Sequence, residues 1–290
     1  MIQALCPASC GELIQGWIHG SEKLISYSIN CYSLVSLTEG RRQESNSLTK
    51  AYKMINKVFE YYKVPSRQSK GLKLEKQSYI PVGKGMASST ADLAATALAT
   101  AAYLGKKISQ AEIASLCVEI EPTDSIIFSD ITLFDHLQGA FIKHYGSNPE
   151  GKLLLLEGRQ AIDTIEFRRT KMTTILKEQG PKLQKALQLF EEGVKTQDFK
   201  KMAEAATISS LANQAILYKD GLEEIIELSC NMGAFGVNIA HSGSVVGILY
   251  EDRYFDQEAF IRLIKGKEYF IKNYESIQQY EMVQGGAVLI

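Results

Sequence analysis

The sequence has almost no net charge: its 290 residues carry 32 lysines and arginines against 33 aspartates and glutamates, a formal net charge of −1. A chain without excess basic charge has no general electrostatic attraction to nucleic acid or to an anionic membrane surface. The sequence also lacks any run of about 18 apolar residues, the length that a membrane-spanning helix needs. We therefore expect no nucleic-acid partner, no membrane span and a small-molecule ligand bound in a local pocket.

Cysteine and histidine are scarce, with five cysteines and four histidines in the chain. Cys6 and Cys10 lie four residues apart, but no second pair and no suitably spaced histidine accompanies them, so the pattern of a zinc site is missing. The first residues lack the basic segment and long apolar run of a secretory signal. We therefore expect free thiols and a cytoplasmic protein.

The length and composition are those of a globular protein of about two domains, at roughly 150 residues for each. Hydrophobic residues make up 45% of the chain and charged residues 22%, enough apolar material for a sizeable core. Apolar patterning predicts strands at 24–39, 71–79, 140–143, 152–157 and 245–250. Spacings of three and four predict helices at 52–62, 91–104, 109 to near 122, 182–217 in two pieces, and 222–232. This mixture predicts the α+β class in two lobes, residues 1–160 and 161–290.

The segment IPVGKGMASSTADLAATALATAAYLG, residues 80–105, joins two different signals. Residues 81–89 are small and flexible, whereas residues 91–104 are mostly Ala, Leu and Thr and close on Gly105, a typical residue after a helix end. Residues 89–92 (STAD) fit a capping box at the start of the helix. A helix N-terminus offers unpaired N–H groups and partial positive charge, so this segment predicts an anion site or, alternatively, only a capped helix.

The loop fits none of three common sequence motifs. No Gly-x-x-x-x-Gly-Lys-Ser/Thr can be written through it, and the dinucleotide fingerprint would need a third glycine where a serine stands, which disfavours an oxidoreductase. Neither Ser88 nor Ser89 lies in the Gly-x-Ser-x-Gly of a nucleophile elbow. Phosphate remains, because the N–H groups of 87–90 could cradle β- and γ-phosphates while the serine hydroxyls reach a phosphate oxygen or Mg²⁺.

Two further stretches accompany this loop: CPASCGELIQG at 6–16 and GAFGVNIAHSGSVVG at 233–247. In order and spacing, the three stretches resemble the motifs of the GHMP kinases, the family of galactokinase, homoserine kinase and mevalonate kinase. The central family motif reads Pro-x-x-x-Gly-Leu-Gly-Ser-Ser-Ala, from which Met86, Ala87 and Thr90 depart conservatively. The resemblance covers roughly residues 4–250.

The resemblance implies a two-lobed α+β fold, with an N-terminal lobe like a ribosomal-protein domain and a ferredoxin-like C-terminal lobe. It also implies ATP and Mg²⁺ as cofactors. Ser88 and Ser89 would then lie at the triphosphate and the metal, and Lys84 could reach phosphate. The implied nucleotide-binding residues are Pro81, Gly83, Lys84, Gly85, Met86, Ala87, Ser88, Ser89, Thr90, Gly243 and Ser244.

The resemblance also implies a metal-binding glutamate near the end of the helix that follows Ser109, in keeping with the preference of Mg²⁺ for carboxylate oxygens. We assign this role to Glu121, directly before Pro122, together with Ser89. Glu119 as the ligand, or both glutamates as solvated charges, are the alternatives.

Within the family, CPASCGELIQGW and the segment from EPTD to FDH look most like L-threonine kinases of cobalamin biosynthesis, which make O-phospho-L-threonine. This implies L-threonine as the acceptor, with Glu12 and Ser9 near it and Glu12 paired with its ammonium group. The resemblance implies that Asp124 is a catalytic base that contacts the acceptor. The alternatives are Asp130, Asp135 or no base at all. Homoserine or a sugar as acceptor, or a non-catalytic nucleotide-binding protein, are the rival functions.

Overall fold

The computed structural model describes residues 1–42, 45–139, 142–162 and 172–290, and ten strands of this part form one sheet. The sheet order is β10-β1-β7-β8-β6-β9-β2-β4-β5, with β3 paired to β2 and β1 also paired to β2. The strands are β1 Ile2–Ile18, β2 Ser21–Glu39, β3 Leu72–Ser78, β4 Thr132–Phe134, β5 Ile142–His144, β6 Lys152–Gly158, β7 Gly236–Ile239, β8 Val246–Tyr250, β9 Tyr274–Val283 and β10 Val288–Leu289.

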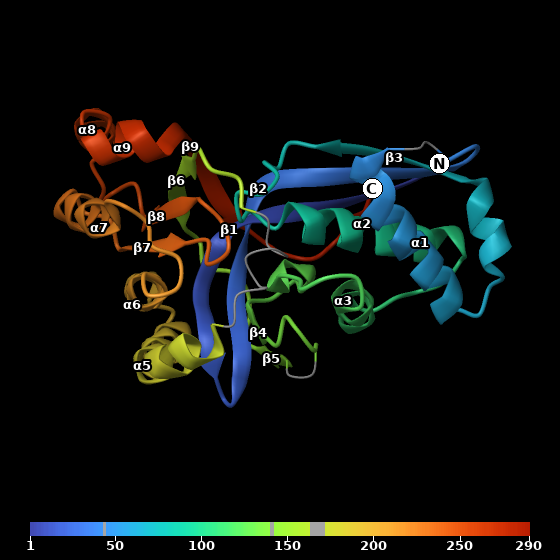
Figure 1. Cartoon of the computed structure of the whole chain (residues 1–290), viewed down its shortest axis with the longest axis horizontal. Helices are drawn as coiled ribbons and strands as arrows, with labels where there is room; N and C mark the ends of the chain where they lie inside the picture. Colours follow the sequence, from blue (N-terminus) through green and yellow to red (C-terminus); the bar gives the residue numbers. More distant parts are fainter. Residues whose placement is uncertain (43–44, 140–141, 163–171) are drawn as a thin grey trace.

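The long hairpin of β1 and β2 runs from the end of the molecule that holds the N-terminus to its middle, where it bends toward its tip (Figure 1). Its antiparallel register extends from Ile2 opposite Leu37 to Ile18 opposite Ser21, with irregularities around Pro7 and between Ser9 and Ile14. Bulges of this kind bend a strand and re-aim its side chains, and they are frequent beside active sites. In the irregular part of β1, side chains can therefore point in directions that a regular strand would not allow.

Three helices cover one end of the hairpin: α1 Thr49–Tyr61, α2 Ser88–Tyr103 and α3 Gln110–Val118. All the alanines of α2 except the half-buried Ala102 are buried, and α2 packs on β1 and β2, because short side chains let a helix approach a sheet closely. Gly105 has φ +65°; its N–H binds the Ala102 carbonyl and that of Lys106 binds Ala101, which confirms the expected glycine-terminated end. Short 3₁₀ turns lie at η1 Asn46–Leu48, η2 Ser66–Gly71 and η3 Ser125–Ile127.

The other side of the molecule contains five helices: α5 Thr173–Thr196, α6 Phe199–Asn213, α7 Leu222–Asn231, α8 Gln257–Ile264 and α9 Glu268–Asn273. Helices α5 and α6 pack on β1, whereas α7 and α8 cover β6–β8 over a second, smaller hydrophobic core. All five cysteines are free thiols. In the part of the chain that the structure describes, no helix is long and apolar enough to cross a membrane.

The α+β class is confirmed, as are most of the expected elements. The capping box of Ser109 with Glu112 is present at α3, and Asp198 caps α6. The expectations missed β1 and everything after 250, and α5 begins well before residue 182. Residues 140 and 141 of an expected strand lie outside the described residues. The division at 160/161 stays a prediction.

Candidate active site

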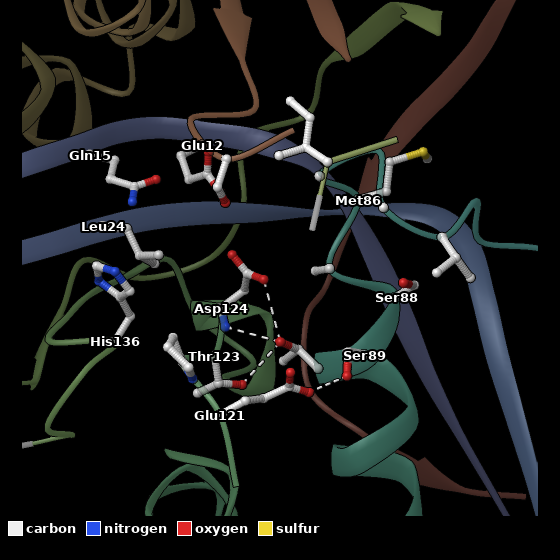
Figure 2. A pocket seen from close by; sticks show the side chains of 18 of the residues that line it. Glu12, Gln15, Leu24, Met86, Ser88, Ser89, Glu121, Thr123, Asp124 and His136 are labelled. Carbon is white, nitrogen blue, oxygen red and sulfur yellow. Dashed lines mark hydrogen bonds between the residues drawn. The ribbon is translucent and has the colours of Figure 1, made fainter. Parts of the chain in front are cut away.

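A cavity of about 720 Å³ lies between β1, the loop that enters α2 and the loop that follows α3 (Figure 2). Ten of the sequence-derived site residues line it: Glu12, Gly83, Gly85, Met86, Ala87, Ser88, Ser89, Thr90, Glu121 and Asp124. The other lining residues are Gln15, Leu24, Lys50, Val82, Pro122, Thr123, His136, Ala161, Ile162 and Ser242.

The loop that enters α2 differs from the expected capping box at residues 89–92. The residue before the helix is Ala87, in the left-handed region at φ +57°, and no side chain caps the helix. The Ser89 hydroxyl donates to Glu121, and Asp92 pairs with Lys76 at 2.6 Å. The capping-box prediction is therefore wrong, because partners from other segments take both side chains. The N-terminus of α2 faces the cavity without a side-chain cap, as an anion site requires.

The three sequence motifs meet at the backbone of this loop, which we call the phosphate loop (residues 81–89). From β1, the Ser9 N–H donates to the Met86 carbonyl and the Gly11 N–H to the Gly85 carbonyl, both at 3.1 Å. From the third motif, the N–H groups of Ser244 and Val245 donate to the Lys84 carbonyl. The three motifs lie far apart in the sequence, but each of them helps to hold this one loop in place.

Glycines make this close packing possible. A Cβ on Gly243 would lie 2.3 Å from the Lys84 carbonyl oxygen, and one on Gly85 would lie 2.2 Å from the Cβ of Ala240. Gly85 also has φ +86°, a conformation that side chains rarely adopt. Gly243 therefore supports the phosphate loop from behind and is not itself on the cavity wall.

Five sequence-derived residues lie off the cavity wall: Pro81, Lys84, Gly243, Ser244 and Ser9. The Lys84 ammonium donates to the carbonyls of Gly158 and Arg159 and lies 2.7 Å from Glu275 of β9. The Ser244 hydroxyl donates to the Gln160 carbonyl at 2.6 Å. Lys84 and Ser244 thus join the phosphate loop and the third motif to the end of β6 and the residues that follow it, and Lys84 also reaches β9.

Ser89 and Glu121 form the side of the cavity suited to a metal ion. Their side chains are hydrogen-bonded to each other, and the other carboxylate oxygen of Glu121 lies 2.6 Å from the Lys50 ammonium. Lys50, at the start of α1, was not anticipated from the sequence. Glu119 lies off the cavity wall and pairs with Lys57 at 2.5 Å. A hydroxyl beside a carboxylate is an oxygen donor set that fits Mg²⁺ with phosphates as further ligands.

Asp124 and Glu12 point toward each other in the middle of the cavity (Figure 2). Asp124 accepts from the hydroxyls of Thr90 at 3.3 Å and Ser26 at 3.4 Å, and its own N–H donates to Thr90. Burial raises the pKa of Asp124 to about 7, and the charge of Glu12 adds to this rise.

Glu12 is fixed from behind by the third motif. Its Oε2 accepts from the backbone N–H of His241 at 3.0 Å and lies 3.1 Å from the His241 Nδ1. The other ring nitrogen of His241 lies 3.2 Å from the hydroxyl of Ser209 on α6, which also accepts from the N–H of Gln15. Glu12 is therefore a buried residue of the cavity wall, 5% exposed, and does not lie on an exposed turn.

The side chain of Lys219 interacts electrostatically with Glu12. Its side chain is buried and its ammonium donates to the Gly243 carbonyl at 2.9 Å. Burial lowers the pKa of Lys219 to about 8, against the opposing effect of the Glu12 charge. No sequence pattern singled out Lys219, since it comes close to Glu12 only through the packing of the third motif.

Gln15, Leu24 and His136 line the end of the cavity beyond Glu12 and Asp124 (Figure 2). His136 is buried on the cavity wall, and its Nε2 lies 3.3 Å from Glu22. Gln15 stands three residues after Glu12, and only the bulged hairpin brings its side chain to the same cavity.

The rival aspartates are placed differently. Asp135 lies off the cavity wall, accepts from the Ser21 hydroxyl at 2.7 Å and accepts from the N–H groups of Leu137 and Gln138, as a turn-capping residue does. Asp130 is also absent from the lining. Among the three aspartates, Asp124 is the one that faces the cavity.

Residues 47–130 match the family described as GHMP kinases N terminal domain, and residues 184–260 match GHMP kinases C terminal. The chain is 38% identical over 290 residues to an L-threonine kinase of Citrobacter freundii, covering 100% of each chain. It is 40% identical to an L-threonine kinase of Salmonella typhimurium, covering 99% of this chain and 95% of that one.

A crystal structure of homoserine kinase from Cytophaga hutchinsonii superposes with a TM-score of 0.72 at 15% identity, covering 100% of this chain and 97% of that chain. At this identity the likeness shows a shared fold and nothing about the acceptor. The chain is near 40% identical to two L-threonine kinases over its full length, two family segments match it, and its three motifs meet at one loop. This chain therefore belongs to the GHMP kinase family.

Proposed function

We propose that the protein transfers the γ-phosphoryl group of ATP to the side-chain hydroxyl of L-threonine, giving O-phospho-L-threonine and ADP for the nucleotide loop of adenosylcobalamin. The observation that carries the proposal is one cavity with an uncapped helix N-terminus on one side and a buried carboxylate pair on the other. The two relatives described as L-threonine kinases, each similar over the whole chain, support this acceptor.

The triphosphate would lie along residues 83–90. The N-terminus of α2 supplies N–H donors and partial positive charge, and Ser88 and Ser89 supply hydroxyls. The exposed side chain of Val82, with Ala161 and Ile162, gives this side an apolar wall. Phosphoryl transfer depends on positioning and charge stabilisation, which such an arrangement supplies.

Mg²⁺ would be held by Glu121 and the hydroxyl of Ser89, with phosphate oxygens completing its ligands. When bound, it would offset negative charge on the β- and γ-phosphates. Within the described residues no three His, Cys, Asp or Glu side chains form a metal cluster, so Mg²⁺ would be bound mainly together with the nucleotide.

L-Threonine would lie at the end formed by Glu12, Gln15, Leu24 and Asp124. The carboxylate of Glu12 is placed to bind the ammonium group, and the Leu24 side chain offers an apolar surface to the methyl group. The hydroxyl oxygen bonds to the γ-phosphorus, the bond from that phosphorus to the β,γ-bridging oxygen breaks, and ADP leaves as the hydroxyl gives up its proton.

An ADP-release assay with Mg·ATP and a panel of acceptors tests this function. We expect turnover with L-threonine and little with L-serine, L-homoserine or sugar alcohols, with O-phosphothreonine identified by mass spectrometry. Turnover with homoserine or a sugar, but not with threonine, would show that the acceptor is a different alcohol. If folded protein releases no ADP with any acceptor, the enzyme function itself is wrong.

A further inference from the structure

The charged side chains on the cavity wall are unevenly balanced. Among the described lining residues, Lys50 pairs with Glu121, whereas Glu12 and Asp124 face each other without a lysine or arginine between them. His136 lies at this end as well, but it is engaged with Glu22. Two buried like charges repel strongly unless a cation or a proton joins them.

Behind Glu12, the wall supplies one positive charge. Lys219 interacts electrostatically with Glu12 while its ammonium donates to the Gly243 carbonyl, and His241 completes the contacts of Glu12. The carboxylates of Glu12 and Asp124 are two negative charges against this one lysine. On the cavity side, no lysine or arginine of the described lining faces this carboxylate pair, since Lys50 pairs with Glu121.

We propose, building on the proposed function, that Asp124 is a second ligand of the acceptor's ammonium group, which it shares with Glu12, and is not a catalytic base. An ammonium group has three N–H donors and one positive charge, so it can donate to both carboxylates and balance them. A neutral hydroxyl in the same place would leave the two buried charges uncompensated.

The surroundings of Asp124 favour this role. The hydroxyls of Ser26 and Thr90 each donate to one of its oxygens, and the backbone N–H of Asp124 donates to Thr90. These contacts hold a carboxylate in a fixed direction toward Glu12 (Figure 2). With its ammonium group held there, a β-hydroxy amino acid keeps its hydroxyl free for the phosphate side, and the hydroxyl proton passes to a phosphoryl oxygen.

Without an acceptor, the pair is balanced by a proton on Asp124, in keeping with the pKa of about 7 that burial and Glu12 give it. Binding of the ammonium group replaces this proton, which leaves to solvent. Acceptors that carry an amine beside the hydroxyl are therefore the class that this site takes, and hydroxy acids without an amine are poor acceptors.

The test compares two acceptors in two variants. L-Threonine and (R)-3-hydroxybutyrate share the hydroxyl and carboxylate, but only the first has the amine. With Asp124→Asn we expect kcat/KM for L-threonine to fall by about 100-fold, mostly through KM, since one partner of a buried charge pair is lost. The already poor activity with (R)-3-hydroxybutyrate should change by less than about 3-fold, because there is no ammonium group to lose. Asp130→Asn, a control outside the cavity, should change neither.

If Asp124→Asn lowered kcat equally with both acceptors, the proposal would be overturned and Asp124 would be identified as a base. If Asp124→Asn does not fold, the release of a proton by the wild type on binding L-threonine decides between the two roles of Asp124. Calorimetry of L-threonine binding without ATP, in buffers of different ionisation enthalpy, gives a readout that does not depend on turnover. Wild type should release about half a proton at pH 7, and Asp124→Asn none.

The binding experiment also separates this inference from the proposed function. Binding with proton release but no phosphorylation of L-threonine would contradict the function and leave the ammonium site standing. Phosphorylation of L-threonine with no release of a proton in wild type would keep the function and overturn the shared ammonium site.

Discussion

The ammonium group of Lys84, in the phosphate loop, lies 2.7 Å from the carboxylate of Glu275 at the start of β9. The same ammonium group donates to the carbonyls of Gly158 and Arg159, and hydrogen bonding to Lys84 lowers the pKa of Glu275. A lysine that sequence reasoning directed at phosphate thus connects the phosphate loop to β9 and to the end of β6.

Lys84→Met should leave these acceptors without a donor and loosen the phosphate loop. We expect a loss of stability of about 1–3 kcal/mol, the usual cost of an unsatisfied buried polar group, and a higher KM for ATP with a nearly unchanged KM for the acceptor. Thermal unfolding and steady-state kinetics measure the two effects. Glu275→Gln, which keeps an acceptor at a half-exposed position, should show a smaller change. A fall in kcat alone would instead indicate that Lys84 contacts the phosphates.

Glu121→Gln should lower kcat and raise the Mg²⁺ concentration needed for half-maximal ADP release, by about 100-fold or more in kcat/KM if a metal ligand is lost. Glu119→Gln is the matched control, because Glu119 lies off the cavity wall and pairs with Lys57. Its Mg²⁺ titration should match wild type. A reversed result would assign the metal to Glu119.

If Glu121 holds the metal ion as proposed, Lys50 would compete with that ion, since its ammonium lies 2.6 Å from the carboxylate. Lys50→Met should therefore lower the Mg²⁺ concentration for half-maximal activity by about 2- to 5-fold, the size expected of a partly exposed ion pair. Lys57→Met removes the corresponding partner of Glu119 and should leave the titration unchanged. A higher KM for ATP in Lys50→Met would show instead that Lys50 holds the triphosphate.

His241→Ala should raise KM for L-threonine by about 10-fold, because Glu12 would keep only the backbone N–H as a donor and lose the ring that directs it. KM for ATP should stay within error. His144→Ala, at an exposed position of β5, is the control and should change neither constant. Equal increases in both Michaelis constants would mean that His241 supports the fold rather than the acceptor end.

Asp124 should make the ligand-free protein less stable as pH rises. Its folded pKa of about 7 lies above the value of about 3.9 in an unfolded chain. The folded state therefore binds more protons between these values, so the stabilisation present below pH 4 is lost as pH rises through 7. The melting temperature of Asp124→Asn should fall less between pH 5 and pH 8 than that of wild type, whereas Asp130→Asn should keep the wild-type slope. Identical slopes in all three would contradict the raised pKa.

Local signals predicted most of the fold. The Ala-rich helix with its Gly105 end and the capped helix after Ser109 depend on residues within a few positions of each other, and both are present as expected. Strand β1 was missed because CPASCGELIQG contains proline, glycine and bulges, so its side chains do not alternate regularly.

The candidate site divides in the same way. Sequence by itself determined the small-residue loop, the helix N-terminus behind it and the three motifs that mark a GHMP kinase. Tertiary structure decided that Ser89 meets Glu121 rather than capping its helix, that Lys84 turns toward Glu275, and that Asp124 rather than Asp130 or Asp135 faces Glu12. Periodicity and helix ends are set by neighbours in the chain, whereas the partner of a charged side chain is set by which distant segments pack beside it.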